Sequence, residues 1–221
     1  MAQGWSDIPA EGLLAIQQGV LRYAYRGVTM QKNPLDLALY LRLLWELKPG
    51  TVIEIGSNAG GAALWFADQT ATFGRAAEVH SVDVVPVRGL AHPKVHFHQG
   101  DGRDLGAVFT PAWLATMPRP WLVIEDADHR PETTEAVLEF FAPHLRPGEW
   151  IVVEDGIVEL FQREHVARHG EPWFDYGGGP AAAIPPFLAR HPGRFEIARD
   201  YCDFFGRNAT WNADGWLRCV A

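Results

Sequence analysis

Carboxylates follow two apolar segments of this chain, at the point where each segment ends. At the end of the first segment the sequence is IEDADH, which contains Asp126, Asp128 and His129. At the end of the second it is IVVEDG, which contains Glu154 and Asp155. Carboxylate oxygens are hard ligands of the kind that Mg²⁺ prefers. A histidine beside them can act as a near-neutral base. The two motifs therefore predict an oxygen-only metal site, with Asp128 and His129 as the candidate catalytic residues.

The predicted metal ligands are Asp128, Glu154 and Asp155. Asp126 is an alternative to Asp128, and it could instead face a cofactor. Either motif alone fits an ordinary strand end whose acids cap the next helix. Together they favour a metal, because neighbouring strands of a sheet lie about 5 Å apart and their ends can converge on one point.

Strand-like and helical segments alternate through the middle of the chain. Strands are expected at 51–56, 78–84, 94–101, 120–129 and 149–156. Strands that are apolar on both faces and separated by helices indicate a parallel sheet covered on both sides. Ligands of such sheets bind beyond the carboxyl ends of the strands, which is where the acids lie.

The flanking segments complete the expected architecture. Residues 8–26 and 34–48 have helical apolar spacing, with Asn33 as the N-cap of the second helix, and RFEIARD and GWLRCV resemble an antiparallel edge pair. We expect one domain over 1–221, a Rossmann-like three-layer α/β/α sandwich with a mostly parallel seven-stranded sheet and an antiparallel C-terminal strand. Its parts would be helices that cover the active site (1–48), a cofactor-binding core (49–156), and an acceptor-side region with edge strands (157–221).

A glycine turn follows the first predicted strand in VIEIGSNAGG. This turn matches neither the dinucleotide pattern GxGxxG nor a phosphate-binding P-loop. Asp83 could accept hydrogen bonds from a ribose diol, and Asp101 and Gly102 could contact an adenine edge. The acids would attract a cation and repel a pyrophosphate, so the sulfonium of S-adenosylmethionine (SAM) fits better than NAD or ATP. The predicted cofactor-binding residues are Glu54, Gly56, Ser57, Asn58, Gly60, Asp83, Asp101, Gly102 and Asp126.

Composition excludes several partners. The formal net charge of -8 supplies no basic stripe for nucleic acid. The N-terminal residues do not resemble a signal peptide, and no apolar stretch approaches the roughly 20 residues that span a bilayer. Two cysteines without CxxC spacing fit a reducing compartment. We expect a cytoplasmic protein that binds neither nucleic acid nor a membrane.

Other histidines and aromatic residues leave two questions open. His80, His92, His96 and His98 could suggest zinc, but no cysteine or spaced pair completes a set, which favours a polar strand face. Aromatic residues after the last parallel strand could form either a substrate wall or core; they are Trp173, Phe174, Tyr176 and Trp211.

Several motifs carry a family resemblance. EIGSNAGG, SVDV and GDGRD resemble the first three motifs of class I SAM-dependent methyltransferases, over about residues 48–156. More narrowly, IEDADH, IVVEDGI and GGGPAAAIPPFL resemble the cephalosporin hydroxylase family, whose fold is that of a methyltransferase. The resemblance implies Asp128, Glu154 and Asp155 as metal ligands, and a homo-oligomer.

The expected function combines this resemblance with the acids. It is a SAM- and Mg²⁺-dependent O-methyltransferase that acts on a hydroxyl of a small molecule, such as a sugar, a catechol or a natural-product intermediate, in secondary metabolism, for example antibiotic biosynthesis. Two alternatives remain open at this point: a SAM-binding protein that does not transfer methyl, and a nicotinamide-dependent oxidoreductase.

Overall fold

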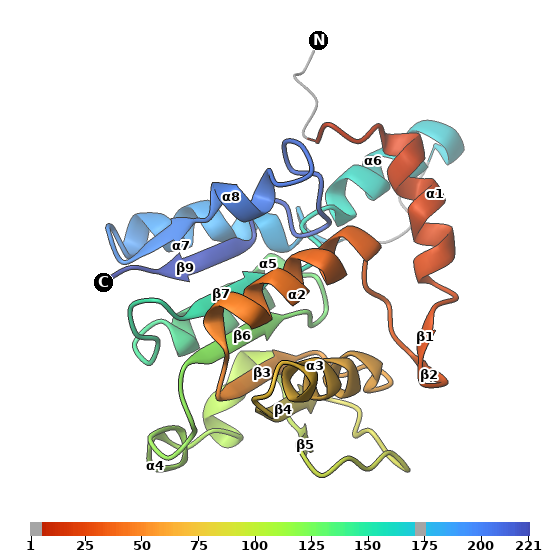
Figure 1. Ribbon diagram of the computed structural model, residues 1–221. Coiled ribbons are helices and arrows are strands. Elements are labelled where there is room, and N and C mark those ends of the chain that lie inside the picture. The colour runs from red at the N-terminus through yellow and green to blue at the C-terminus, as the bar shows by residue number, and fades with distance from the viewer. Residues whose placement is uncertain (1–5, 171–175) are drawn as a thin grey trace.

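The computed structural model describes residues 6–170 and 176–221, which form a sheet with helices on both faces (Figure 1). The strand order of the main sheet is β5-β4-β3-β6-β7-β9-β8. Its strands are β3 (Thr51–Ile55), β4 (Glu78–Asp83), β5 (Val95–Gln99), β6 (Trp121–Glu125), β7 (Trp150–Val153), β8 (Phe195–Ile197) and β9 (Trp216–Cys219). The first five run parallel, and β9 pairs antiparallel with both β7 and β8. The predicted fold is confirmed.

Two hydrophobic clusters lie on opposite faces of the sheet. Helices α2 (Pro34–Leu47), α3 (Gly61–Thr72) and α8 (Arg199–Cys202) contribute buried side chains to one cluster. Helices α4 (Pro111–Leu114), α5 (Pro131–Phe141) and α7 (Ile184–Arg190), with the 3-10 helices Gly102–Ala107 and Pro180–Ala183, cover the other face. β3 and β6 are buried along their whole length, as expected of central strands between two helical layers.

The N-terminal segment differs from the prediction of one helix over 8–26. Helix α1 (Ala10–Val20) ends earlier, and a small hairpin of β1 (Ala24–Tyr25) and β2 (Val28–Thr29) follows it. Arg26 and Gly27 form the hairpin turn with positive φ angles of 52° and 80°. A helix cannot pass through such a turn, and the apolar spacing of the sequence did not reveal it.

Helix α1 packs beside α6 (Val158–His169), away from the sheet (Figure 1). Trp211 lies in the small hydrophobic cluster between these helices and its ring meets that of Phe161 at 5.7 Å. Trp211 is therefore core. Among the described residues, no helix combines the length and the apolar character needed to cross a bilayer.

Candidate active site

A cavity of about 560 Å³ opens at the carboxyl ends of β3, β4, β6 and β7. Residues 29–32, which run from the end of β2 toward α2, form another part of its wall. Most of the predicted site residues line it, namely Glu54, Gly56, Ser57, Asn58, Asp83, Asp101, Gly102, Asp126, Asp128, His129 and Asp155. Gly60 and Glu154 are not among the lining residues. The acids predicted to face the cofactor and most of those predicted to bind the metal therefore line one cavity.

The glycine turn after β3 is fixed by close approach of the backbone. Gly56 has a φ of 108°, and its N–H donates to the carbonyl of Val82 at 2.8 Å. A Cβ at this position would lie 1.8 Å from the carbonyl oxygen of Asp126. Glycine is therefore required both by the backbone angle and by the loop that follows β6.

We expect Gly56→Ala to destabilise the protein strongly and to abolish SAM binding, because the clash would push apart the loops after β3 and β6. Gly74→Ala is the matched control, since Gly74 has a φ of 80° but no atom within 4 Å of an added Cβ. This control should lose only about 1–2 kcal/mol of unfolding free energy. Urea unfolding and calorimetry with SAM measure both effects, and equal losses in the two variants would contradict the steric explanation.

Asp83 and Glu54 link the glycine turn to β4. Asp83 accepts from the backbone N–H of Asn58 at 2.9 Å and from that of Val85 at 2.9 Å. Behind the turn, the Ser81 hydroxyl donates to Glu54 at 2.5 Å and lies 2.7 Å from the Ser57 hydroxyl. Burial raises the pKa of Glu54 to about 7. The cofactor end is thus a preorganised, acid-lined turn.

Asp101 is already paired within its own loop. Its carboxylate accepts from the backbone N–H of Arg103 at 2.9 Å and forms a salt bridge with the Arg103 guanidinium at 3.0 Å. Gly102 begins the 3-10 helix next to it. Arg103 also lines the cavity, so this end of the site carries a positive charge. The prediction of a cofactor site from the glycine turn did not consider this charge.

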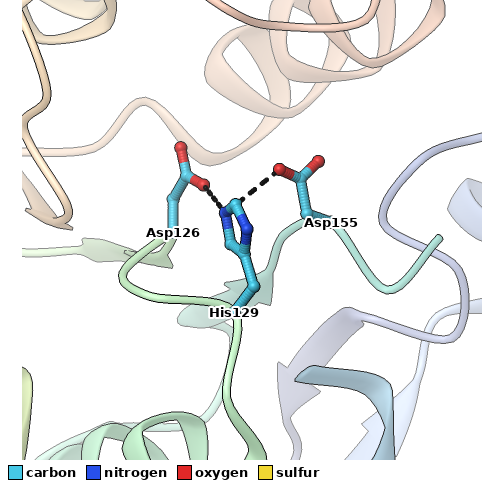
Figure 2. A group of neighbouring side chains, drawn as sticks. All are labelled: Asp126, His129 and Asp155. Carbon is cyan, nitrogen blue, oxygen red and sulfur yellow. Dashed lines mark hydrogen bonds and ion pairs between the residues drawn. The ribbon is translucent and has the colours of Figure 1, made fainter. Parts of the chain in front are cut away.

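Asp126, His129 and Asp155 converge from the loops after β6 and β7 (Figure 2). Nε2 of His129 lies 3.4 Å from Oδ1 of Asp126 and 3.3 Å from Oδ2 of Asp155. One ligand atom from each residue falls within 4.8 Å of the others, which suits a common cation. His129 and Asp155 have φ angles of 59° and 52°, in the left-handed region that few non-glycine residues adopt, and their side chains point toward each other (Figure 2).

The surroundings shift the pKa of each member of this group, and burial raises that of the Asp155 carboxyl above its ordinary value. For Asp126, burial would raise the pKa, but the positive charges of Lys32 and His129 outweigh it and lower the pKa below its ordinary value. For His129, burial would lower the pKa, but the hydrogen bond with Asp126 and the charge of Asp155 raise it to about 9. His129 is therefore an imidazolium at neutral pH without a metal. A cation bound between the carboxylates would remove the stabilisation that keeps this proton in place.

The three metal ligands predicted from the sequence do not converge on one point in the structure. Asp155 belongs to the converging group, together with Asp126, the alternative first ligand. Asp128 is exposed and accepts from the backbone N–H of Arg130 at 3.2 Å, close to the start of α5. Glu154 is buried, and its two oxygens accept hydrogen bonds from Tyr40 at 2.5 Å and Lys32 at 2.5 Å.

Lys32 and Tyr40 are site residues that sequence reasoning missed. Both belong to the N-terminal segment, outside the repeated strand and helix pattern. Asn33 caps α2 as predicted, accepting from the N–H of Leu35 at 3.0 Å, which fixes Lys32 just before the helix. The sequence signal was a lysine directly before that cap, which by itself says nothing of burial.

Tyr176 lies next to His129, although it is not among the residues that line the cavity. Its ring centroid lies 5.7 Å from that of His129. Trp173 and Phe174, named with it as an aromatic wall, fall outside the described residues. Trp211 belongs to the core, whereas a substrate wall at Tyr176 stays a prediction.

The other histidines form no zinc site within the described residues. His80 and His98 contact each other at 3.1 Å through ring nitrogens, and His96 contacts Glu78 at 2.9 Å. His92 lies 3.4 Å from Asp68 instead. The cluster covers one face of β4 and β5 beside Trp113.

We expect His80→Phe to reduce the acid sensitivity of the protein. Burial lowers the pKa of His80 to about 4, whereas an unfolded histidine titrates near about 6.5. Between these values the unfolded chain binds more protons, so His80 lowers stability as the pH falls. Urea unfolding at pH 7 and pH 5 should show a smaller loss in the variant. If both proteins lost the same unfolding free energy between pH 7 and pH 5, His80 would not be the source of the acid sensitivity.

Comparisons with known proteins agree with this geometry. The family model described as Rhamnosyl O-methyltransferase/CmcI matches residues 17–220. A rhamnosyl O-methyltransferase of Mycobacterium tuberculosis (strain ATCC 25618 / H37Rv) is 28% identical over 194 residues, covering 85% of this chain and 75% of the relative. One of Mycobacterium leprae (strain TN) is 29% identical over 183 residues, covering 80% and 76%.

Solved structures with similar folds include two of CmcI. An apo structure is 25% identical with a TM-score of 0.68, covering 91% of this chain and 77% of that chain. A structure of CmcI with Mg and SAM is 26% identical with a TM-score of 0.66, covering 91% and 78%. The chain therefore belongs to the Rhamnosyl O-methyltransferase/CmcI family, which confirms the resemblance drawn from its motifs.

Proposed function

We propose that this protein is a SAM- and Mg²⁺-dependent O-methyltransferase that acts on a hydroxyl of a small molecule. The observation that carries the proposal is the convergence of Asp126, His129 and Asp155 at the edge of a cavity whose other end is the acid-lined glycine turn. The family and the CmcI structure with Mg and SAM support both expected cofactors.

The donor set fits a hard divalent cation. Asp126 and Asp155 supply carboxylate oxygens of the kind that Mg²⁺ and Mn²⁺ prefer, and His129 lies beside them as a candidate base rather than as a required ligand. Glu154, predicted as a ligand from the sequence, is connected to Asp126 through Lys32, which contacts both carboxylates. It could bind the same cation if the side chain of Lys32 moved away. When bound, Mg²⁺ would supply Lewis-acid and template chemistry at the acceptor hydroxyl.

The residues of this chain supply position and charge. Glu54, Asp83 and the glycine turn would hold the sulfonium donor at one end of the cavity, and Tyr176 would border the acceptor at the other. In the transfer, the acceptor oxygen forms a bond to the methyl carbon while the carbon–sulfur bond breaks, which releases S-adenosylhomocysteine. We propose that His129, in its neutral form, would take the hydroxyl proton.

The acceptor and its pathway are finer parts of the proposal. The relatives reported above are named rhamnosyl O-methyltransferases, which supports a sugar or other vicinal diol as the acceptor. A role in secondary metabolism is proposed from the sequence resemblance alone. A homo-oligomer is also proposed, and light scattering after size-exclusion chromatography measures it.

Two measurements test the proposal. Calorimetry should show SAM binding that NAD does not displace, which separates a methyltransferase from a nicotinamide-dependent enzyme. Mass spectrometry should then detect S-adenosylhomocysteine when Mg²⁺ and rhamnosides, other hydroxylated sugars or catechols are supplied. Binding of SAM without S-adenosylhomocysteine for any acceptor of the panel would instead favour a SAM-binding protein without transfer.

A further inference from the structure

Lys32 is a buried cation between two acids of the site. Its Nζ lies 2.5 Å from Oδ2 of Asp126 and 2.5 Å from Oε2 of Glu154, and its side chain is 3% exposed. The Tyr40 hydroxyl donates to the other oxygen of Glu154 at 2.5 Å. Groups of the chain itself therefore satisfy both oxygens of Glu154 and one oxygen of Asp126.

The remaining oxygen of Asp126 faces the imidazole of His129. Its Oδ1 lies 3.4 Å from Nε2 of His129, while Oδ2 contacts Lys32. Asp126 is thus shared between the ammonium on one side and the group with His129 and Asp155 on the other. A dication that binds Asp126 must come close to the ammonium or take its place.

We propose that Lys32 is an internal counter-cation, which holds Asp126 and Glu154 together in the absence of metal and lowers the affinity of the site for divalent cations. The inference rests on the metal site proposed above. An ammonium in contact with two carboxylates offsets one of the two negative charges that attract a metal, and it repels a dication at short range. It also stabilises the metal-free fold, because buried carboxylates without a partner are costly to desolvate.

The position of Lys32 connects metal binding to the cofactor pocket. Residues 29–32 line the same cavity as Glu54 and Asp83. The Asn33 cap and Pro34 fix the chain just after Lys32, so displacement of the ammonium would have to move its side chain or the preceding residues of the wall. Metal binding is therefore expected to alter the wall that faces the cofactor.

Direct metal binding tests the inference without any turnover. We expect Lys32→Met to bind Mn²⁺ at least about ten-fold more tightly than the natural protein, measured by electron paramagnetic resonance on the full chain without SAM. Lys32→Arg keeps the charge and should stay near the natural affinity. Lys94→Met is the matched control, because it removes the same formal charge from an ion pair with Glu78 at the β4–β5 edge and should leave the affinity unchanged.

A stability measurement covers the case in which the variant folds poorly. In EDTA, Lys32→Met should melt at a lower temperature than the natural protein, and Mg²⁺ should raise its Tm by more than it raises the natural Tm. The double variant Lys32→Met with Glu154→Gln removes the ammonium together with the charge of one of its two acid partners, and it should regain part of the lost stability in EDTA.

The outcomes separate this inference from the proposed metal site. If the natural protein binds Mn²⁺ and folded Lys32→Met binds it equally or more weakly, the counter-cation role is overturned. A double variant that is less stable in EDTA than Lys32→Met also overturns it. Absence of Mn²⁺ binding in both proteins would overturn the metal site itself.

Discussion

Replacement of Asp155 by asparagine is expected to lower the turnover number for methyl transfer by at least about 100-fold while SAM binding survives. The substitution keeps the size of the side chain and removes the charge from the converging group. Asparagine also tolerates the φ of 52° at this position, so the loop should keep its shape. Turnover with a responsive acceptor and calorimetry with SAM measure the two effects separately.

Asp128→Asn is the matched control for this prediction. Asp128 follows the same strand as Asp126 but is exposed and lies outside the converging group. We therefore expect Asp126→Asn to lose activity with Asp155→Asn, and Asp128→Asn to keep most of it. If Asp128→Asn lost activity and Asp126→Asn kept it, Asp128 would be the metal ligand, as predicted from the sequence. Full activity of Asp155→Asn would remove this acid from the mechanism.

Removal of divalent metal is expected to abolish methyl transfer, and added Mg²⁺ should restore it. Without a cation, His129 fills the space between Asp126 and Asp155 as an imidazolium, because their charges raise its pKa to about 9. A protonated imidazole cannot accept the proton of the acceptor hydroxyl. Turnover is measured after exhaustive EDTA treatment and again after addition of Mg²⁺.

SAM binding provides the control for the chelation experiment. The glycine turn and Asp83 are held by backbone hydrogen bonds that involve no metal. Calorimetry in EDTA should therefore still show SAM binding. Unchanged turnover after EDTA treatment would refute the catalytic role of the metal, and loss of SAM binding would mean that the metal also builds the cofactor site.

Much of the fold could be predicted because buried strands are rich in apolar residues, which can be recognised in the sequence. β3 and β6 are fully buried and consist mostly of apolar residues, and the acids that follow β6 and β7 had to lie at one sheet edge. The motifs at these ends also indicated the family and the O-methyltransferase class, which the family match confirms. The N-terminal hairpin escaped prediction because its strands are only two residues long.

Which acids converge could not be predicted in the same way. The path of a loop decides this, and His129 and Asp155 turn inward through positive φ angles that no apolar pattern encodes. Lys32 is a harder case, because its partners Asp126 and Glu154 lie 94 and 122 residues further along the chain. The choice between Asp126 and Asp128 as a ligand was left open by sequence and is now a question for the variants above.

Transfer of a labelled methyl group tests the central claim most directly. SAM that carries a ¹³C-methyl group is incubated with the protein, Mg²⁺ and a rhamnoside or other vicinal diol, and the product is examined by mass spectrometry and NMR. We expect the label in a new O-methyl group of the acceptor, one S-adenosylhomocysteine for each product, and neither product with Asp155→Asn or in EDTA. Label that reaches the acceptor equally in EDTA, or in the presence of Asp155→Asn, would contradict the proposed mechanism.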